Sequence, residues 1–193
     1  MRNFIVLLII ILSFPVRAQK LNTTKLYIIE PKVGLTSYPI DKTTLPEIIA
    51  DFGNNYEQYE NNFIRVSKEG HPDLYEIKYK TLGISFYFFN NDSTQKIKAV
   101  KFYKPFKVKT KSNIILNESN IRDVIKRYEK SRMLISGNGI ITVNAYKLTT
   151  TGIRFSSELL NFSLDNFPSE EKLKNQIVDK IYISNYQHEF LMD

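Results

Sequence analysis

The chain has 193 residues, a formal net charge of +7, two histidines and no cysteine. The absence of cysteine excludes disulfide bonds, thiol catalysis and the lipidated cysteine of bacterial lipoproteins, and two histidines are too few for a multi-histidine metal site. With 42% hydrophobic and 13% aromatic residues, the composition is that of a packed globular protein. The net charge is a mild bias toward acidic partners rather than a sign of nucleic-acid binding.

Residues 1–18 have the three-part pattern of a secretory signal peptide. Arg2 supplies the positive charge, positions 4–14 form an apolar run, and Val16-Arg17-Ala18 places small residues at −3 and −1 before Gln19. The alternative, a membrane anchor, needs about 20 consecutive apolar residues, roughly twice the length of this run. The sequence therefore predicts an exported protein, periplasmic or extracellular, with no transmembrane span after cleavage.

A lead-in segment, residues 19–42, carries one short predicted strand at 26–29. A helix should follow, because the apolar residues Leu45, Ile48, Ile49 and Phe52 are spaced i, i+3, i+4 and i+7, along one helix face. Thr44 and Glu47 form the Thr-x-x-Glu pattern of a capping box, and Gly53 favours a stop at the other end.

This helix opens a first predicted unit, residues 43–106. Residues 54–62 fit either a loop or a second short helix, and 63–66 fit a strand. Three further segments, 75–80, 84–89 and 97–102, indicate an antiparallel meander, the first because apolar and charged residues alternate along it. Residues 107–118 are read as a linker with a lysine-rich strand at an exposed sheet edge.

The same order of elements comes again in a second predicted unit, residues 119–185, followed by a tail, 186–193. A helix capped by Ser119 or Asn117 should run to about Lys130. Strands are expected at 140–148, 152–156 and 178–183. The segment 159–176 makes the second hairpin longer than the first. Long loops on a repeated scaffold are often functional, and the alternative is that this segment packs a gap at the end of the sheet. We therefore expect an α+β fold in which two tandem helix-plus-antiparallel-meander units (α-β-β-β twice) form a continuous antiparallel sheet with helices on one face.

The pattern shared by the two units is a helix face, a Tyr-x-Tyr or similar strand, Gly-Ile-x-Phe, a polar turn and a final strand. The positions that carry it are Leu45, Ile48, Ile49, Phe52, Gly53, Tyr75, Ile77, Tyr79, Gly83, Ile84, Phe86, Val100 and Phe102, then residues 121–128, Gly152, Ile153, Phe155, Ile181 and Ile183. This pattern resembles the BamE/SmpA-like and β-lactamase-inhibitor-protein-like (BLIP-like) superfold over residues 26–185. The resemblance implies an exported binding or inhibitory module with one open sheet face. Two departures are Glu129, where a Gly would follow the second helix, and the missing lipoprotein cysteine.

Strand alternation predicts which side chains lie on that open face. If Tyr75, Ile77, Tyr79, Ile84, Phe86, Phe88, Val100 and Phe102 face the helices, the opposite face carries the intervening residues. The candidate partner-binding residues are Lys78, Lys80, Tyr87, Phe89, Lys101, Tyr103, Lys147, Arg154 and Tyr182, and Lys180 lies on the same face. Aromatic anchors among positive charges are typical of protein interfaces. The alternative is an ordinary solvated face.

The sequence offers no catalytic constellation, metal site or cofactor motif, and His71 and His188 read as surface residues. Two functions remain. The first is a non-enzymatic protein-binding module, inhibitor-like or an envelope accessory, whose partner is another exported or envelope protein with acidic character. The second is a binder of an acidic small ligand, glycan or anionic lipid head group through residues 96–111, where seven of sixteen residues are lysine. Nucleic acid is not expected as a partner.

Overall fold

The computed structural model of the chain describes residues 24–61, 74–128, 131–135, 140–144, 152–159 and 167–185. It is an α+β arrangement of two sheets with few helices. The predicted signal peptide, the strand predicted at 63–66, both histidines, Lys147 and the predicted tail from 186 onward lie outside these residues. Within them, no helix is long and apolar enough to cross a membrane.

The larger sheet has eight strands in the order β4-β5-β6-β7-β12-β11-β10-β9, and all its pairings are antiparallel. Its strands in chain order are β4 (Glu57–Asn61), β5 (Leu74–Tyr79), β6 (Ile84–Phe89), β7 (Ala99–Tyr103), β9 (Arg132–Ile135), β10 (Ile140–Asn144), β11 (Ile153–Glu158) and β12 (Lys180–Ser184). The central pairing joins β7 to β12, with Val100 opposite Ile183.

The smaller sheet has the order β3-β2-β1-β8. It consists of β1 (Tyr27–Glu30), β2 (Gly34–Leu35), β3 (Tyr38–Pro39) and β8 (Val108–Thr110). The lead-in segment thus holds three short strands where we predicted one. The predicted linker strand is β8, which pairs in parallel with β1 and forms one edge of this sheet.

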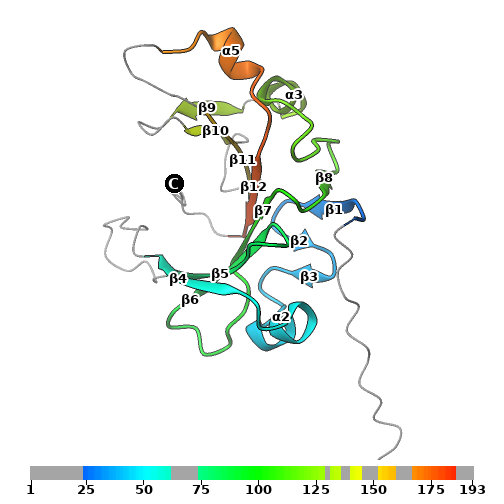
Figure 1. The fold of residues 1–193 in the computed structure, drawn as a ribbon, viewed down its shortest axis with the longest axis vertical. Coiled ribbons are helices and arrows are strands. Elements are labelled where there is room, and N and C mark those ends of the chain that lie inside the picture. Colours follow the sequence, from blue (N-terminus) through cyan, green and yellow to red (C-terminus); the bar gives the residue numbers. More distant parts are fainter. Residues whose placement is uncertain are drawn as a thin grey trace, which may run out of the picture.

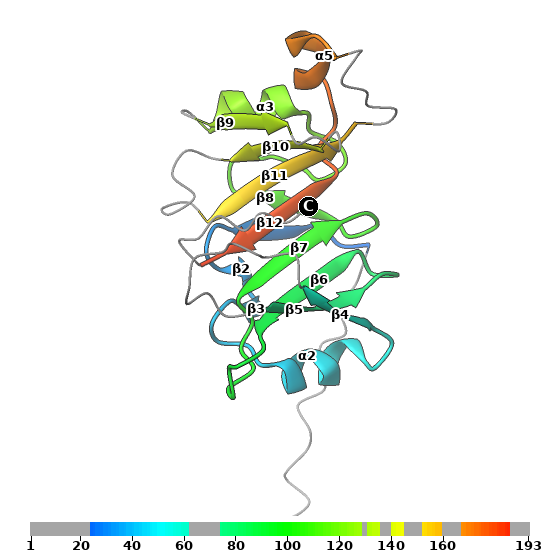
Figure 2. The ribbon, with the colours of Figure 1, turned by 90° about the vertical axis from the view of Figure 1, so that its left-hand side faces the viewer.

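The large sheet is curved. Figure 1 shows its end strands, β4 and β9, bending toward the same side. The small sheet and the helices α2 (Leu45–Phe52) and α3 (Ile121–Arg127) lie on the opposite, convex side. The short helix α5 (Glu170–Lys174) contacts α3. Figure 2 looks onto the concave side, where the eight strands lie in front.

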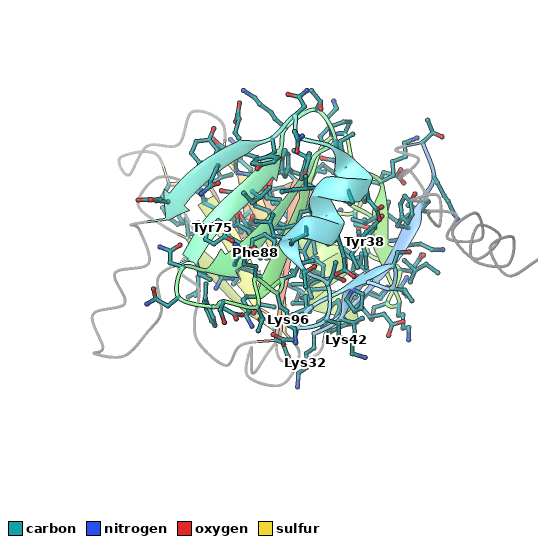
Figure 3. All side chains as sticks on the ribbon, turned by 90° about the horizontal axis from the view of Figure 1, so that it is seen from below. Lys32, Tyr38, Lys42, Tyr75, Phe88 and Lys96 are labelled. Atoms are coloured by element: carbon teal, nitrogen blue, oxygen red, sulfur yellow. The ribbon has the colours of Figure 1, made fainter. Side chains whose placement is uncertain are left out.

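The hydrophobic core fills the space on the convex side. It includes Ile77, Phe86 and Phe102 from the large sheet together with Ile48 of α2 and Val124 of α3, all fully buried. Every residue that alternation placed toward the helices in the first half belongs to this core. Tyr75 and Phe88, on neighbouring strands, stack with ring centroids 5.3 Å apart and lie side by side in Figure 3.

The two longer helices both begin with a capping box. Glu47 accepts a hydrogen bond from the Thr44 backbone N–H at 2.7 Å, so the predicted capping box is present. In α3 the cap is Asn120, not Ser119 or Asn117 as predicted. Its side chain accepts from the Asp123 N–H, and the Asp123 carboxylate accepts from the Asn120 N–H, both at 3.0 Å. Asn-x-x-Asp thus replaces Thr-x-x-Glu, and the described helix ends at Arg127, before Lys130.

The two glycines of the shared Gly-Ile-x-Phe pattern are required for the same structural reason. Gly83 and Gly152 both have positive φ, 76° and 59°, which favours glycine. At each, a Cβ atom would lie 2.2 Å from a backbone oxygen of a neighbouring strand, Tyr103 O or Ser184 O. Each glycine carbonyl in turn accepts a hydrogen bond from that same residue. No side chain therefore fits at either turn.

Two strands of the large sheet were missed. Residues 54–62 were predicted as a loop or short helix, but Glu57–Asn61 forms β4, an edge strand. β9 (Arg132–Ile135) was not predicted and forms the opposite edge. Each helix, α2 and α3, is therefore followed by four strands of the sheet rather than the three that we expected.

Candidate functional site

The candidate site is the concave face of the large sheet. One line of directly opposed residues crosses six neighbouring strands of this face: Glu57, Lys78, Ser85, Lys101, Tyr182 and Arg154. Their neighbours along each strand, such as Ile77, Phe86 and Ile181, belong to the core on the other side. Because side chains alternate between the faces of a strand, the line faces away from the helices.

An ion pair lies near the middle of this face. Lys101 Nζ is 2.9 Å from Glu76 Oε1, and the two side chains keep only 16% and 9% of their exposure. Burial by itself would raise the pKa of Glu76, but the adjacent Lys101 ammonium and hydrogen bonds from Ser85 and Tyr87 together outweigh it and hold that pKa below its usual range. Burial lowers the pKa of Lys101, and the Glu76 carboxylate opposes that shift.

Tyrosines surround the Lys101 ammonium. Its Nζ lies 5.5, 5.8 and 6.0 Å from the ring centroids of Tyr87, Tyr182 and Tyr103. Such distances permit cation–π attraction to each ring. Burial raises the pKa of Tyr103 to about 12 and also raises those of Tyr87 and Tyr182, so all three phenols stay protonated at neutral pH.

A second lysine is placed differently. Lys78 Nζ lies 5.6 Å from the ring centroid of Tyr59 and 5.8 Å from that of Tyr103. Among the described residues, no carboxylate forms an ion pair with it. Glu57, directly opposite on β4, instead accepts a hydrogen bond from the Tyr59 hydroxyl at 2.5 Å.

Three buried hydroxyls lie on the same face. The Ser85 hydroxyl interacts with the Glu76 carboxylate and the Tyr103 hydroxyl, and the Ser156 hydroxyl interacts with Tyr182. Ser85 lies between Lys78 and Lys101 in the register of the sheet. We call Glu76, Lys78, Ser85, Tyr87, Lys101, Tyr103 and Tyr182 the concave cluster.

The expectation of an exposed face needs correction. Tyr87, Arg154 and Tyr182 lie on the predicted face but are only 1%, 7% and 8% exposed. Both tyrosine rings contact Lys101, and strand alternation alone does not reveal this burial. Lys78, Lys101, Tyr103 and Phe89 are half-buried, and Tyr59, which the sequence did not single out, is 44% exposed.

The remaining residues that the sequence predicted for this face do not belong to the concave cluster. Lys80 is exposed in the turn after β5. Phe89, at the end of β6, lies with its ring centroid 5.3 Å from Lys98 Nζ rather than beside the concave cluster. Lys180 is paired with Glu158 at 3.3 Å. Lys147 lies outside the described residues. Within the part of the chain that is described, no three His, Asp or Glu side chains are grouped to hold a metal ion.

The lysines of residues 96–111 do not form one surface. Lys98 is buried and paired with Asp41 and Asp92, Lys101 belongs to the concave cluster, and Lys111 is paired with Glu30 of β1. Figure 3 shows Lys96 at one edge of the molecule, where Lys32 and Lys42 also point outward. The run of lysines in the sequence is therefore divided between both sheets and an edge.

A scan of protein-family models finds no match for this chain, and neither does a search of curated proteins. A solved structure that it is similar to is that of the uncharacterised protein YfeY from Escherichia coli, at 12% sequence identity and a TM-score of 0.48, covering 83% of this chain and 99% of that chain.

Proposed function

We infer that the protein is an exported, non-enzymatic binding module whose concave sheet face binds another exported or envelope protein. The observation that carries this proposal is the concave cluster. Its three tyrosine rings and its ion pair are held in position by contacts within the chain itself. Aromatic anchors that are held rigid lose little side-chain entropy on binding. Exposed Tyr59 and half-buried Lys78 and Tyr103 supply the contact surface beside it.

The two halves of the large sheet support a repeated unit as the origin of this face. A capped helix followed by four strands occurs twice, and the last strands of the two series, β7 and β12, pair at the centre. Gly83 and Gly152 make equivalent close approaches to those two strands. A duplicated unit of BLIP-like type accounts for a binding face twice as wide as one unit provides.

The alternative is a binder of small acidic ligands, glycans or anionic lipid head groups. Its sequence argument is the lysine run, and this run is divided in space, with Lys98, Lys101 and Lys111 already in ion pairs. It therefore has less support than the protein-binding module. Binding of that kind should weaken sharply between low and physiological salt, because exposed charges are screened over about 8 Å at physiological ionic strength.

Site-specific photo-crosslinking in the source cells tests the proposal. A photoreactive residue is placed at Tyr59, on the concave side, and as a matched control at Ile28, which is 51% exposed on β1 of the small sheet. One protein partner crosslinked from position 59 and absent from position 28 supports the module. Equal capture from both positions, or none from position 59, contradicts it.

Export is tested separately by sequencing the N-terminus of the protein recovered from the exported fraction. The expected first residue is Gln19. Recovery of an uncleaved chain that retains Met1 would overturn the proposed periplasmic or extracellular location.

A further inference from the structure

The outer face of the small sheet carries lysines and aliphatic side chains together. Strands β1 and β8 run in parallel, with Ile28 opposite Lys109. The residues next to them along each strand, Ile29 and Val108, are fully buried in the core. Because side chains alternate along a strand, Ile28 and Lys109 point away from the large sheet. They lie on the side of the molecule opposite to the concave face (Figure 1).

The charges of this outer face are mostly positive. The charged side chains of residues 24–30 and 107–111 are Lys25, Glu30, Lys107, Lys109 and Lys111. Glu30 pairs with Lys111 at 2.9 Å, and both side chains stay partly exposed. Within the part of the chain that the structure describes, the other three lysines form no ion pair. The face therefore has an excess of positive charge.

Two aliphatic side chains lie beside these lysines. Leu26 and Ile28 are 41% and 51% exposed. Next to them opens a hollow of about 260 Å³, whose lining includes Lys25, Thr36 and Ser37 as well as both aliphatic residues. Lysines at a sheet edge often serve to prevent pairing with other chains. That role does not explain why apolar side chains are exposed beside them.

We propose that this lysine–aliphatic face docks on the surface of an anionic phospholipid membrane; its members are Lys25, Leu26, Ile28, Lys107, Lys109 and Lys111. The inference goes beyond the proposed function and does not depend on it. Lysine is depleted in protein interfaces, and leucine is under-represented among their hot spots, so this composition is unlike that of a protein-binding surface. It is typical of surfaces that lie on a membrane, where aliphatic side chains enter the interfacial layer and lysines attract anionic lipids.

The placement of the lysine–aliphatic face suits this role. It lies on the convex side of the large sheet, whereas the concave cluster lies on the other side. A chain that rests on a membrane through the first face turns the second toward the aqueous phase, where a protein partner can reach it. The hollow beside Ile28 has apolar and hydroxyl-bearing walls, which suits the boundary between lipid head groups and acyl chains.

Sedimentation with lipid vesicles tests the proposal. The chain used is residues 19–193, which include every described residue, because the apolar leader could itself bind lipid. Vesicles contain phosphatidylcholine alone or with about 30% phosphatidylglycerol, at about 50 mM salt so that screening stays weak. Binding is expected to the anionic vesicles only. Equal binding to both kinds of vesicle, or none to the anionic ones, would overturn the proposal.

Two double variants with the same change of charge locate the site. Lys107→Gln/Lys109→Gln should weaken binding to anionic vesicles about thirtyfold, because each lysine close to an anionic surface contributes a factor of about five. Lys42→Gln/Lys96→Gln removes the same charge at the edge seen in Figure 3 and should change binding by less than about twofold. Equal weakening by the two variants would mean that only net charge matters, and would overturn the site.

Ile28→Thr tests the aliphatic part of the face. Threonine keeps the β-branched shape that strands favour, so thermal denaturation should stay close to that of the wild type. Binding to anionic vesicles should weaken about tenfold, because an aliphatic side chain no longer enters the interfacial layer. Unchanged binding by this variant would overturn the proposed insertion of Ile28.

The crosslinking experiment separates a lipid from a protein on this face. A photoreactive residue at position 28 should crosslink to lipid in the source cells. Crosslinking of position 28 to one protein would overturn the membrane assignment. Failure of vesicle binding would also overturn it, but would leave the binding module standing, because that proposal is tested at position 59.

Discussion

The two faces of the large sheet carry different kinds of buried side chain on the same strands: apolar on the convex face and polar on the concave face. On the convex face, residues such as Ile77, Phe86 and Phe102 are fully buried by helices and by a second sheet. On the concave face, Glu76, Ser85 and Tyr87 are nearly as buried, yet they are polar, and Ser85 and Tyr87 hydrogen-bond to the Glu76 carboxylate. Burial on the first face follows from hydrophobic packing, whereas burial on the second depends on charge pairing, so the two faces should respond differently to substitution.

The largest effect is expected on the convex face. Phe86→Ala should lower the free energy of unfolding by about 3–5 kcal/mol, because it removes a fully buried ring and leaves a cavity. Urea denaturation of the variant and of Phe89→Ala, a half-buried phenylalanine of the same strand, measures it. A cost for Phe86→Ala no greater than that for Phe89→Ala would contradict the assignment of faces.

A smaller but still large effect is expected for the ion pair on the concave face. Glu76→Gln leaves the Lys101 ammonium buried without a counter-charge, which should cost about 3 kcal/mol. The double variant Glu76→Gln/Lys101→Met should recover most of that loss, because no charge is then left unpaired. A double-mutant cycle in urea measures the coupling; additive losses would mean that the pair contributes no specific interaction.

The pH dependence of stability should distinguish the same two faces. Because the folded-state pKa of Glu76 is lowered from its ordinary 4.5, the stability that this group contributes is fully present above that pH. It is lost as the pH falls through the lower folded-state pKa. We therefore expect the urea midpoints of wild type and Glu76→Gln to converge on acidification below pH 4.5, while the difference between wild type and Phe86→Ala persists. Parallel curves for Glu76→Gln would contradict the pKa direction.

The smallest effect is expected for Ser85→Ala, next to Phe86 on the same strand. Its buried hydroxyl hydrogen-bonds to the Glu76 carboxylate, so removing it should lower the free energy of unfolding by about 1 kcal/mol. Urea denaturation measures this loss. A loss as large as that of Glu76→Gln would contradict this order of effects.

Strand alternation was the most informative signal in the sequence. It assigned Tyr75, Ile77 and Tyr79 to the core face correctly, because a half-buried strand must alternate between apolar and polar residues. It missed β4, whose sequence Glu-Gln-Tyr-Glu-Asn has little strand preference and pairs along one side only. Such an edge strand forms because it pairs with the adjacent strand, not because its own residues favour strand structure.

Most residues of the candidate site could be named from the sequence, but their burial and their contacts could not. Five members of the concave cluster were named from their positions alone: Lys78, Tyr87, Lys101, Tyr103 and Tyr182. Glu76 and Ser85 were not named. The burial of Tyr87 and Tyr182 was not predicted, because it depends on contacts between strands, such as those of both rings with Lys101. The pairing of Glu76 with Lys101 likewise joins strands whose register the sequence does not state, since β6 lies between them. Tyr59 was missed because the strand that holds it was missed.

The central position of β12 has a consequence for the order in which the chain folds. β12 (Lys180–Ser184) pairs with β7 on one side and β11 on the other, so it alone connects the two series of strands in the sheet. Synthesis proceeds from the N-terminus, and β7 is complete long before residue 180 exists. Until then β7 keeps an unpaired edge, of the kind that recruits other chains into aggregates. The protein is therefore most exposed to misassembly in the interval before β12 is made, and a nascent chain stopped short of residue 180 cannot pair the two series of described strands.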